Sequence, residues 1–132
     1  MTILEQMEKC IEWYGGNYDK ATPDQLLDCK TKINTLLFNY LNEVSDHKKD
    51  SVFSTVYRKY HHHNFKSQLI AQKMTATLAE SKSIEHTFQD LKDEATTESL
   101  AYLSKLKLDQ ANKIVDDITQ RLSFIKEEMK KV

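Results

Sequence analysis

Apolar residues in the last part of the chain recur in two interleaved series, each with a period of seven residues. The first series is Ala111, Ile118 and Ile125, and the second, offset by four positions, is Leu108, Val115, Leu122 and Met129. Polar and charged residues fill the positions between them, as in the seam of a coiled coil. Because a helix does not leave such a seam in water, we expect it to pair with another helix of this chain and with a second copy. We therefore assign these seven residues to oligomerisation.

Boundary signals divide the rest of the chain into helices. A helix start is predicted where Ser or Thr is followed three residues later by Glu or Gln, and proline favours the first helical position. The starts are Thr2 with Glu5 and Thr22 with Pro23 and Gln25, and the breaks are Gly15–Gly16 and Ser81–Ser83. With two Gly and one Pro in 132 residues, few other turns are available. We predict a single all-α domain in which a short helix (residues 1–16) packs near a long helical hairpin (22–80 and 84–130).

Composition narrows the possible functions. The formal net charge is −1, so binding to nucleic acid requires a local basic patch. The sequence has no phosphate-cradling glycine loop, nucleophile elbow or HExxH motif, so we predict neither enzymatic activity nor a cofactor. No apolar run approaches the roughly 20 residues of a membrane span, and charged residues interrupt the N-terminal stretch. Together with Cys10 and Cys29 outside any CxxC arrangement, this predicts a cytoplasmic protein with free thiols, in the host cytoplasm if a phage encodes it.

The segment from Arg58 to Lys82 is locally basic. It contains five Lys and Arg residues against the single acid Glu80, a local charge of +4, and Lys59, Lys66 and Lys73 are seven apart and predicted to share one helix face. Cations interleaved with aromatic rings are what single-stranded nucleic acid binds, through its phosphates and unstacked bases. The predicted contacts are Tyr57, Arg58, Lys59, Tyr60, His62, Phe65, Lys66 and Lys73. The alternative is a basic face that neutralises acids of a neighbouring helix, with the rings in the core.

Three consecutive histidines, His61, His62 and His63, raise the question of a metal site. On a helix, consecutive imidazoles point in three directions, whereas a helical metal pair needs ligands three or four residues apart. Asn64 and Phe65 do not supply such a ligand. We therefore predict no metal site and assign the run to a polar helix face or, when protonated, to a phosphate-contacting surface.

Five stretches carry a family resemblance: TPDQLL at 22–27, VYRKY at 56–60, SKS at 81–83, ANKI at 111–114 and ITQRLSFIK at 118–126. In these the chain resembles the UvsY-type recombination mediators, a family of small helical phage proteins. The resemblance implies a cytosolic, ring-like homo-oligomer that binds single-stranded DNA. It also implies a role in loading a recombinase onto strands coated by single-strand-binding protein. A short run of alternating apolar and basic residues contributes to DNA binding in that family, and Tyr57–Tyr60 occupies a comparable place without matching it residue for residue.

The leading hypothesis is therefore a non-enzymatic, homo-oligomeric mediator of phage recombination or replication that binds single-stranded DNA. The alternative is a structural or adaptor coiled-coil phage protein, either a virion component or an inhibitor that binds a host protein. In that case the basic face is a protein-docking surface. A third hypothesis, a metal-dependent enzyme that uses the histidines, has the least support because the ligand spacing is wrong.

Overall fold

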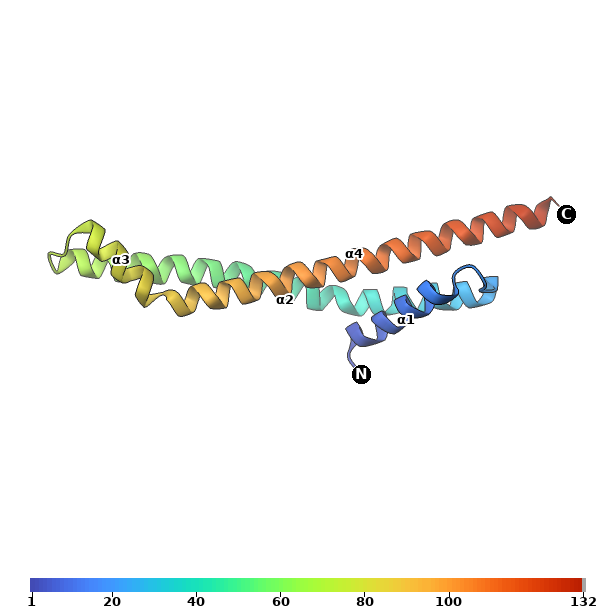
Figure 1. Ribbon diagram of the computed structural model, residues 1–132, viewed down its shortest axis with the longest axis horizontal. Helices are drawn as coiled ribbons and strands as arrows, with labels where there is room; N and C mark the ends of the chain where they lie inside the picture. Colours follow the sequence, from blue (N-terminus) through green and yellow to red (C-terminus); the bar gives the residue numbers. More distant parts are fainter. Residues whose placement is uncertain (132) are drawn as a thin grey trace. The chain divides into compact units, whose positions relative to one another are not determined.

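The computed structural model describes residues 1–131, and all regular structure within them is helical. The helices are α1 (Ile3–Asn17), α2 (Pro23–Ala71), α3 (Ala76–His86) and α4 (Phe88–Lys130) (Figure 1). The prediction of an all-α fold is confirmed, whereas the coiled coil and the oligomer stay predictions. Two compact units are formed: unit 1 contains Met1–Val44 and the described residues from Ser104 onward, and unit 2 contains Ser45–Leu103. Both units use segments of α2 and α4, and cooperative folding as one domain also stays a prediction.

The first two helices begin with the caps that the sequence predicts. Thr2 Oγ1 accepts the Glu5 N–H at 3.1 Å, and Glu5 Oε2 accepts the Thr2 N–H at 3.3 Å. At the start of α2, Thr22 Oγ1 accepts the Gln25 N–H at 3.2 Å, and Gln25 Oε1 accepts the Thr22 N–H at 3.0 Å. Thr22 directly precedes the helix, and Gln25 lies in its first turn. Each exchange satisfies two backbone donors that lack a partner inside the helix. The two helix starts therefore follow from local sequence.

Helix α1 continues past the glycine pair at which we predicted its end. It extends to Asn17, and neither Gly15 nor Gly16 has a positive φ. The Asn17 side-chain amide donates to the Trp13 carbonyl at 2.7 Å, and the Tyr18 N–H donates to the Tyr14 carbonyl at 2.9 Å, so the helical bonding spans both glycines. The left-handed freedom of glycine, on which the prediction rested, is not used here.

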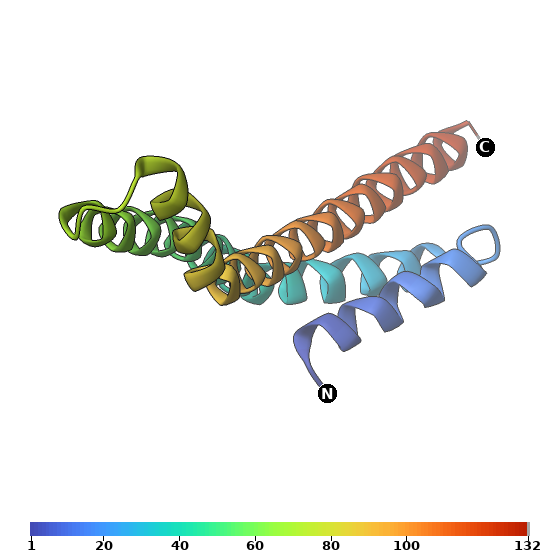
Figure 2. The ribbon, with the colours of Figure 1, turned by 60° about the vertical axis from the view of Figure 1, so that its left-hand side comes forward.

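The core of unit 1 joins α1, the first part of α2 and the last part of α4. Figure 2 shows α1 beside the first part of α2. The buried residues are Met7, Tyr14, Leu26, Cys29, Ile33, Leu37, Tyr40, Ala111 and Ile118. Leu108, Val115, Leu122 and Ile125 are partly buried and pack against the same cluster. The apolar seam of α4 therefore packs against α1 and α2 of the same chain, which removes its apolar side chains from water.

A polar cluster connects α1 to α4 beside this core. The Tyr14 hydroxyl donates to the Asp117 carboxylate, and Arg121 Nε donates to the Tyr14 oxygen at 3.0 Å and to Asp117 at 3.1 Å. The Arg121 guanidinium also lies 4.5 Å from the centre of the Tyr18 ring, within the range of a cation–π contact. Because these bonds need one alignment of the two helices, they select the register in which the apolar seam packs.

The chain reverses direction within unit 2 at residues 72–75, and not at the predicted break. Helix α2 ends at Ala71, so the prediction that it continues to residue 80 is wrong. Lys73 has a φ of 69°, its N–H donates to the Ile70 carbonyl at 2.9 Å, and the Met74 N–H donates to the Leu69 carbonyl at 3.2 Å. This is a Schellman end, in which the left-handed residue is usually glycine. A lysine in that position gives no signal in the sequence.

Ser83, which belongs to the break predicted before the last helix, lies inside α3 instead. It is fully buried, and its hydroxyl donates to the Ala79 carbonyl at 2.7 Å. A serine that bonds back to the carbonyl four residues earlier continues a helix. The cap of α3 is Thr75, whose hydroxyl accepts the Leu78 N–H at 3.3 Å, and Thr87 separates α3 from α4.

Unit 2 has very little apolar core. Its buried residues are Ala79, Ser83 and Thr87, all of them small. Most of the large apolar side chains of the unit lie substantially in solvent: Val52, Phe53, Val56, Tyr57, Tyr60, Ile70, Leu78, Ile84, Phe88, Leu91, Leu100, Tyr102 and Leu103. Unit 2 therefore depends on polar and ring contacts between its helices, and it presents an apolar surface of a kind that usually marks an interface.

Candidate nucleic-acid interface

The basic segment of α2 is divided between two faces of the helix in unit 2. Side chains directed at α3 and α4 are Arg58, His61, His62, Phe65 and Lys66. Side chains exposed to solvent are Val52, Val56, Tyr57, Lys59 and Tyr60. The division follows from the 3.6-residue repeat, because a run of adjacent residues must point around the whole helix.

Arg58 is paired with an acid of α4. Its Nε donates to the Glu94 carboxylate, which also accepts the Thr55 hydroxyl at 3.3 Å. The hydrogen bond from Arg58 lowers the pKa of Glu94 below its usual value. The Glu94 carboxylate is therefore ionised at neutral pH and offsets the charge of Arg58, which weakens the attraction of Arg58 for a phosphate.

Lys66 and His62 share one carboxylate of α3. Lys66 Nζ lies 2.7 Å from a Glu80 oxygen, and His62 Nε2 lies 3.2 Å from the other. The hydrogen bond from Lys66, followed by that from His62, lowers the pKa of Glu80. These contacts correspond to the alternative in which basic side chains neutralise the acids of a neighbouring helix.

Rings fill the space between α2 and the end of α3. Phe65 stacks on His86 with ring centroids 3.9 Å apart, and the His61 ring meets the edge of His86 at 5.1 Å. His61 Nδ1 is 2.5 Å from an Asp90 oxygen. Phe65 is therefore held inside unit 2 and is a structural ring here. Its predicted role as a stacking surface would require the Phe65–His86 pair to open.

Three of the predicted contact residues remain open to solvent within one turn of α2. Tyr57 is 49% exposed and Tyr60 69% exposed. Lys59 is also exposed, and Tyr60 lies between it and Tyr57 on this side of the helix. Among residues 1–131, Lys59 has no ion-pair partner within 4 Å. Two exposed rings beside a free ammonium group are the elements of a stacking and phosphate-contacting surface.

Lys73 does not share the helix face predicted for it. The seven-residue spacing places Lys73 on the same face as Lys59 and Lys66 only if the helix continues to Lys73. Helix α2 ends two residues earlier, at Ala71. Its positive φ places it in the turn instead. Unit 2 as a whole contains eight Lys and Arg residues and eight Asp and Glu residues, so the basic character is local to α2.

The acids and the ring that hold this region could not be identified from the sequence. They are Glu80, His86, Asp90 and Glu94. With the hairpin turn expected at Ser81–Ser83, Glu80 was predicted to lie on the same helix as Lys66, which excludes a contact across the turn. A reversal at residues 72–75 would have placed these groups opposite α2, but Lys73 gives no sign of it.

The residues assigned to oligomerisation lie mainly inside unit 1. Ala111 and Ile118 are fully buried in its core. Met129 differs from them, being 71% exposed. A contact between copies through this seam stays a prediction, and in the present packing Met129 is its most accessible member.

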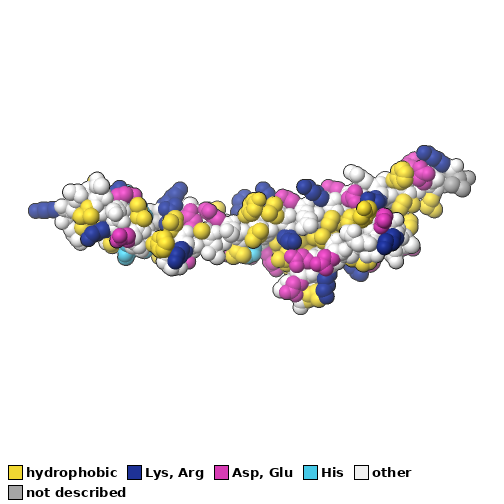
Figure 3. Space-filling model, viewed as in Figure 1, with side chains coloured by type: hydrophobic (Ala, Val, Ile, Leu, Met, Phe, Trp, Pro, Cys, Tyr) yellow, Lys and Arg dark blue, Asp and Glu magenta, His cyan; other side chains and the backbone are white. Residues whose placement is uncertain are grey.

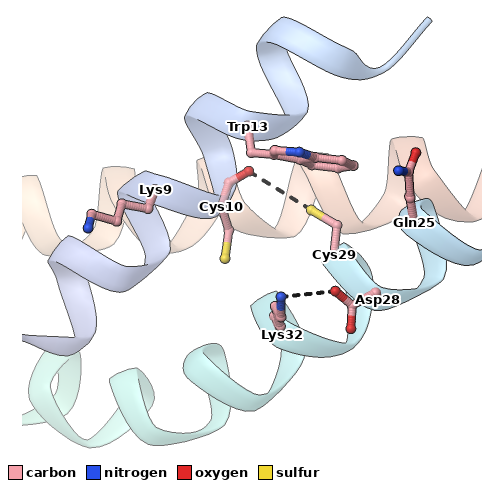
Figure 4. Close-up of a pocket in the computed structure, with 7 residues that line it drawn as sticks. All are labelled: Lys9, Cys10, Trp13, Gln25, Asp28, Cys29 and Lys32. Atoms are coloured by element: carbon pink, nitrogen blue, oxygen red, sulfur yellow. Dashed lines mark hydrogen bonds and ion pairs between the residues drawn. The ribbon is translucent and has the colours of Figure 1, made fainter. Parts of the chain in front are cut away.

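A groove in unit 1 contains both cysteines (Figure 4). It measures about 400 Å³ and is lined by Lys9, Cys10, Trp13, Gln25, Asp28, Cys29 and Lys32. Both thiols are free, and the Cys29 thiol lies 3.9 Å from the Cys10 carbonyl oxygen. Burial raises the pKa of Cys29 to about 11 and also raises that of Cys10. The thiols are therefore protonated at neutral pH and are weak nucleophiles.

The part of the chain that the structure describes contains neither a metal site nor a membrane-spanning helix. Within residues 1–131, no group of three or more His, Cys, Asp or Glu side chains is arranged to hold a metal ion. No helix in that range is both long enough and apolar enough to cross a membrane. Comparison of the chain with protein-family models, with curated proteins and with solved structures finds no match.

Proposed function

We propose that this protein is a non-enzymatic mediator of phage recombination or replication that binds single-stranded DNA as a homo-oligomer. Its role is to help load a recombinase onto strands coated by single-strand-binding protein. The observation that supports the DNA contact is the outward surface formed by Tyr57, Lys59 and Tyr60 on α2. The family resemblance supports the role in loading a recombinase.

The chemistry of this surface suits unpaired strands better than a duplex. The tyrosine rings offer flat faces on which unstacked bases stack, and each such contact contributes about 1–3 kcal/mol. Lys59 lies close enough in sequence to contact a phosphate of the same strand. One free cation gives a weak site, and repetition of the site in an oligomer raises the effective affinity without new contacts.

Arg58 and Lys66 take a different role in this proposal from the one expected of them. Their pairs with Glu94 and Glu80 hold α2 against α3 and α4, and they thereby position Tyr57, Lys59 and Tyr60. A charge reversal at Lys66 would place a second carboxylate beside Glu80, and would therefore disturb the contacts within unit 2 as well as any DNA contact. The informative substitutions are therefore on the outward face.

The test is binding of a fluorescent single-stranded oligonucleotide, followed by anisotropy from about 50 to 200 mM salt. We expect Lys59→Glu to weaken binding roughly tenfold and to reduce the salt slope by about 0.7 for each phosphate that is no longer neutralised. Tyr60→Ala should weaken binding by about 1–3 kcal/mol for each base that no longer stacks, with little change in the slope. The matched control is Lys113→Glu, the same charge change at an exposed lysine of unit 1. Absence of binding at low salt, or equal effects of Lys59→Glu and Lys113→Glu, would reject the proposal.

A second candidate is a structural or adaptor coiled-coil protein, either a virion component or an inhibitor of a host protein. Two observations favour it: the pairing of Arg58 and Lys66 with acids, and the exposed apolar side chains of unit 2. A protein partner that co-purifies while the ratio of absorbance at 260 nm to 280 nm stays that of protein would support this candidate over the first.

A further inference from the structure

Cys10 of α1 and Cys29 of α2 face each other across one helix–helix contact of unit 1. The two helices form an antiparallel hairpin, and Figure 2 shows α1 beside the first part of α2. Cys10 lies seven residues before the end of α1, and Cys29 lies six residues after the start of α2. Residues at similar distances from the turn of such a hairpin lie opposite each other. The fold therefore brings together two thiols that are 19 residues apart in the chain.

Both cysteines also lie on the inner sides of their helices. Cys10 follows the buried Met7 by three residues, and Cys29 follows the buried Leu26 by three, a spacing that keeps residues on one helix face. The Cys29 sulfur lies 3.9 Å from the Cys10 carbonyl oxygen, and Figure 4 shows no labelled side chain between the two cysteines. That oxygen is about 2.4 Å from its own Cα. Bonding of the two sulfurs therefore requires a change of rotamer at Cys10 and a small approach of the helices.

The groove beside the cysteines gives a small reactant access to Cys10 first. It measures about 400 Å³, and Cys10 is half-buried in it whereas Cys29 is only 4% exposed. Burial raises the pKa of the Cys10 thiol, and the nearby Lys32 ammonium partly offsets that rise. An accessible thiol with a buried thiol behind it is the arrangement in which the first reacts and the second resolves the product.

We propose that Cys10 and Cys29 form a redox-controlled latch, an intramolecular disulfide that fixes α1 to α2. The oxidant is a low-molecular-weight disulfide such as oxidised glutathione. The Cys10 thiol loses its proton and attacks one sulfur of the oxidant, which forms a mixed disulfide at Cys10 and releases one small thiol. The Cys29 thiol then loses its proton and attacks the Cys10 sulfur, which breaks the mixed disulfide and releases the second small thiol. Two protein thiols are thereby oxidised to a disulfide, the oxidant is reduced to two thiols, and the two protons end on those thiols.

The latch acts on a helix with few buried contacts. Helix α1 supplies two buried residues, Met7 and Tyr14, whereas α2 supplies five. Its outer side carries the exposed Glu5 and Glu12, and Figure 3 shows acidic and basic side chains at the surface over this helix. A segment with few buried apolar contacts opens locally at a low free-energy cost. The disulfide suppresses this opening, and a dithiol reductant restores it.

The closed form is a stable cross-link and not an easily reduced, catalytic disulfide. Burial keeps both thiols protonated at neutral pH, so the reduced form gains no free energy from ionisation. Easily reduced disulfides are those whose reduced form is stabilised, as when a thiol has a low pKa. The latch does not depend on the proposed DNA contact, and its test uses no nucleic acid, so the two proposals fail separately.

Mass spectrometry of the full chain, incubated with oxidised glutathione at about pH 8 to raise the thiolate fraction, tests the latch. We expect a product about 2 Da lighter than the reduced chain, with Cys10 and Cys29 in one cross-linked peptide. Cys29→Ser should instead accumulate a mixed disulfide at Cys10. Cys10→Ser should react at least tenfold more slowly, because Cys29 is buried. A mixed disulfide that persists in the parent protein, a disulfide between two copies, or no reaction would overturn the proposal.

Comparison with the unfolded chain shows whether the fold itself positions the two thiols. The equilibrium with oxidised and reduced glutathione gives the effective concentration of one thiol at the other, in buffer and in about 8 M urea. We expect the native value to exceed the unfolded value at least tenfold, because the unfolded chain must lose loop entropy to close. By linkage, oxidation then raises the ratio of folded to unfolded protein by the same factor. A native value equal to or below the unfolded one would contradict the latch.

Hydrogen exchange separates a latch from a bond that leaves the motion of α1 unchanged. Amides of α1 should exchange more slowly after oxidation and return to their original rates when a dithiol reductant is added. Amides of α3, in unit 2, are the control and should keep their rates. If a disulfide forms but exchange in α1 stays the same, the bond does not act as a latch.

Discussion

At the scale of single residues, Lys73 decides more than its exposed position suggests. Its positive φ ends α2 and starts the reversal that brings α3 and α4 back along α2 within unit 2. An L-residue in the left-handed region costs about 1–2 kcal/mol, and glycine avoids that cost. The seven-residue spacing of the lysines predicted a helical position for Lys73, but a spacing pattern cannot reveal where the helix ends.

Replacing Lys73 tests this account. We expect Lys73→Gly to raise the free energy of unfolding by about 0.5–1 kcal/mol, because the strain at Lys73 exceeds the added freedom of glycine in the unfolded chain. Lys73→Val should lower the free energy of unfolding by about 1 kcal/mol or more, because the left-handed region is least favourable for a β-branched residue. Urea unfolding of the three proteins measures both changes. A stable valine variant would mean that residue 73 is not left-handed in solution.

At the scale of the elements, unit 2 is held by ion pairs where unit 1 is held by a core. The contacts of α2 with Glu80 and Glu94 join it to α3 and α4, and only small side chains are buried beside them. Exposed ion pairs contribute little singly. The stability of unit 2 should therefore depend more strongly on carboxylate charge than the stability of unit 1 does.

A pH titration tests the contribution of Glu80. Because the folded-state pKa of Glu80 is lowered by Lys66 and His62, its stabilising effect is present above the unfolded pKa of about 4.3, and is lost as the pH falls through the folded value. We expect the urea concentration at the unfolding midpoint to decrease as the pH is lowered below about 5. Glu80→Gln should make this midpoint less dependent on pH. Glu85→Gln is the control, since Glu85 is exposed on the same helix. If both variants follow the parent protein, the Glu80 contacts do not contribute to stability.

At the scale of the whole molecule, apolar burial is distributed unevenly between the two units. Unit 1 contains the large buried side chains, including Met7, Leu26, Ile33 and Ile118, whereas unit 2 leaves most of its large apolar residues in solvent. Segments with few buried apolar contacts open locally at a lower free-energy cost than segments in a packed core. Unit 2, which presents the outward tyrosines, is therefore expected to be the less stable of the two.

Hydrogen exchange read by mass spectrometry tests this distribution. At low micromolar concentration, amides of residues 29–40 should exchange more slowly than those of residues 52–60, although both segments belong to α2. Uniform protection along α2 would show that the two units do not open separately.

Much of the local structure could be predicted from the sequence. Thr2 with Glu5 and Thr22 with Gln25 cap their helices as predicted, and the all-helical class follows from apolar periodicity. The candidate site was less accessible to prediction. Tyr57, Lys59 and Tyr60 were found by composition and do face solvent. Composition could not tell that Arg58, His62 and Lys66 face inward, because their partners lie on other helices.

The sequence by itself determined where the first two helices begin and which residues of α4 form its apolar seam. Caps and periodicity act within one or two helical turns, so neighbouring residues are enough to specify them. Only the tertiary structure decided the reversal at Lys73, the use of the seam inside unit 1, and which cations of α2 are neutralised. These depend on the register between segments far apart in the chain, and no local pattern contains that register.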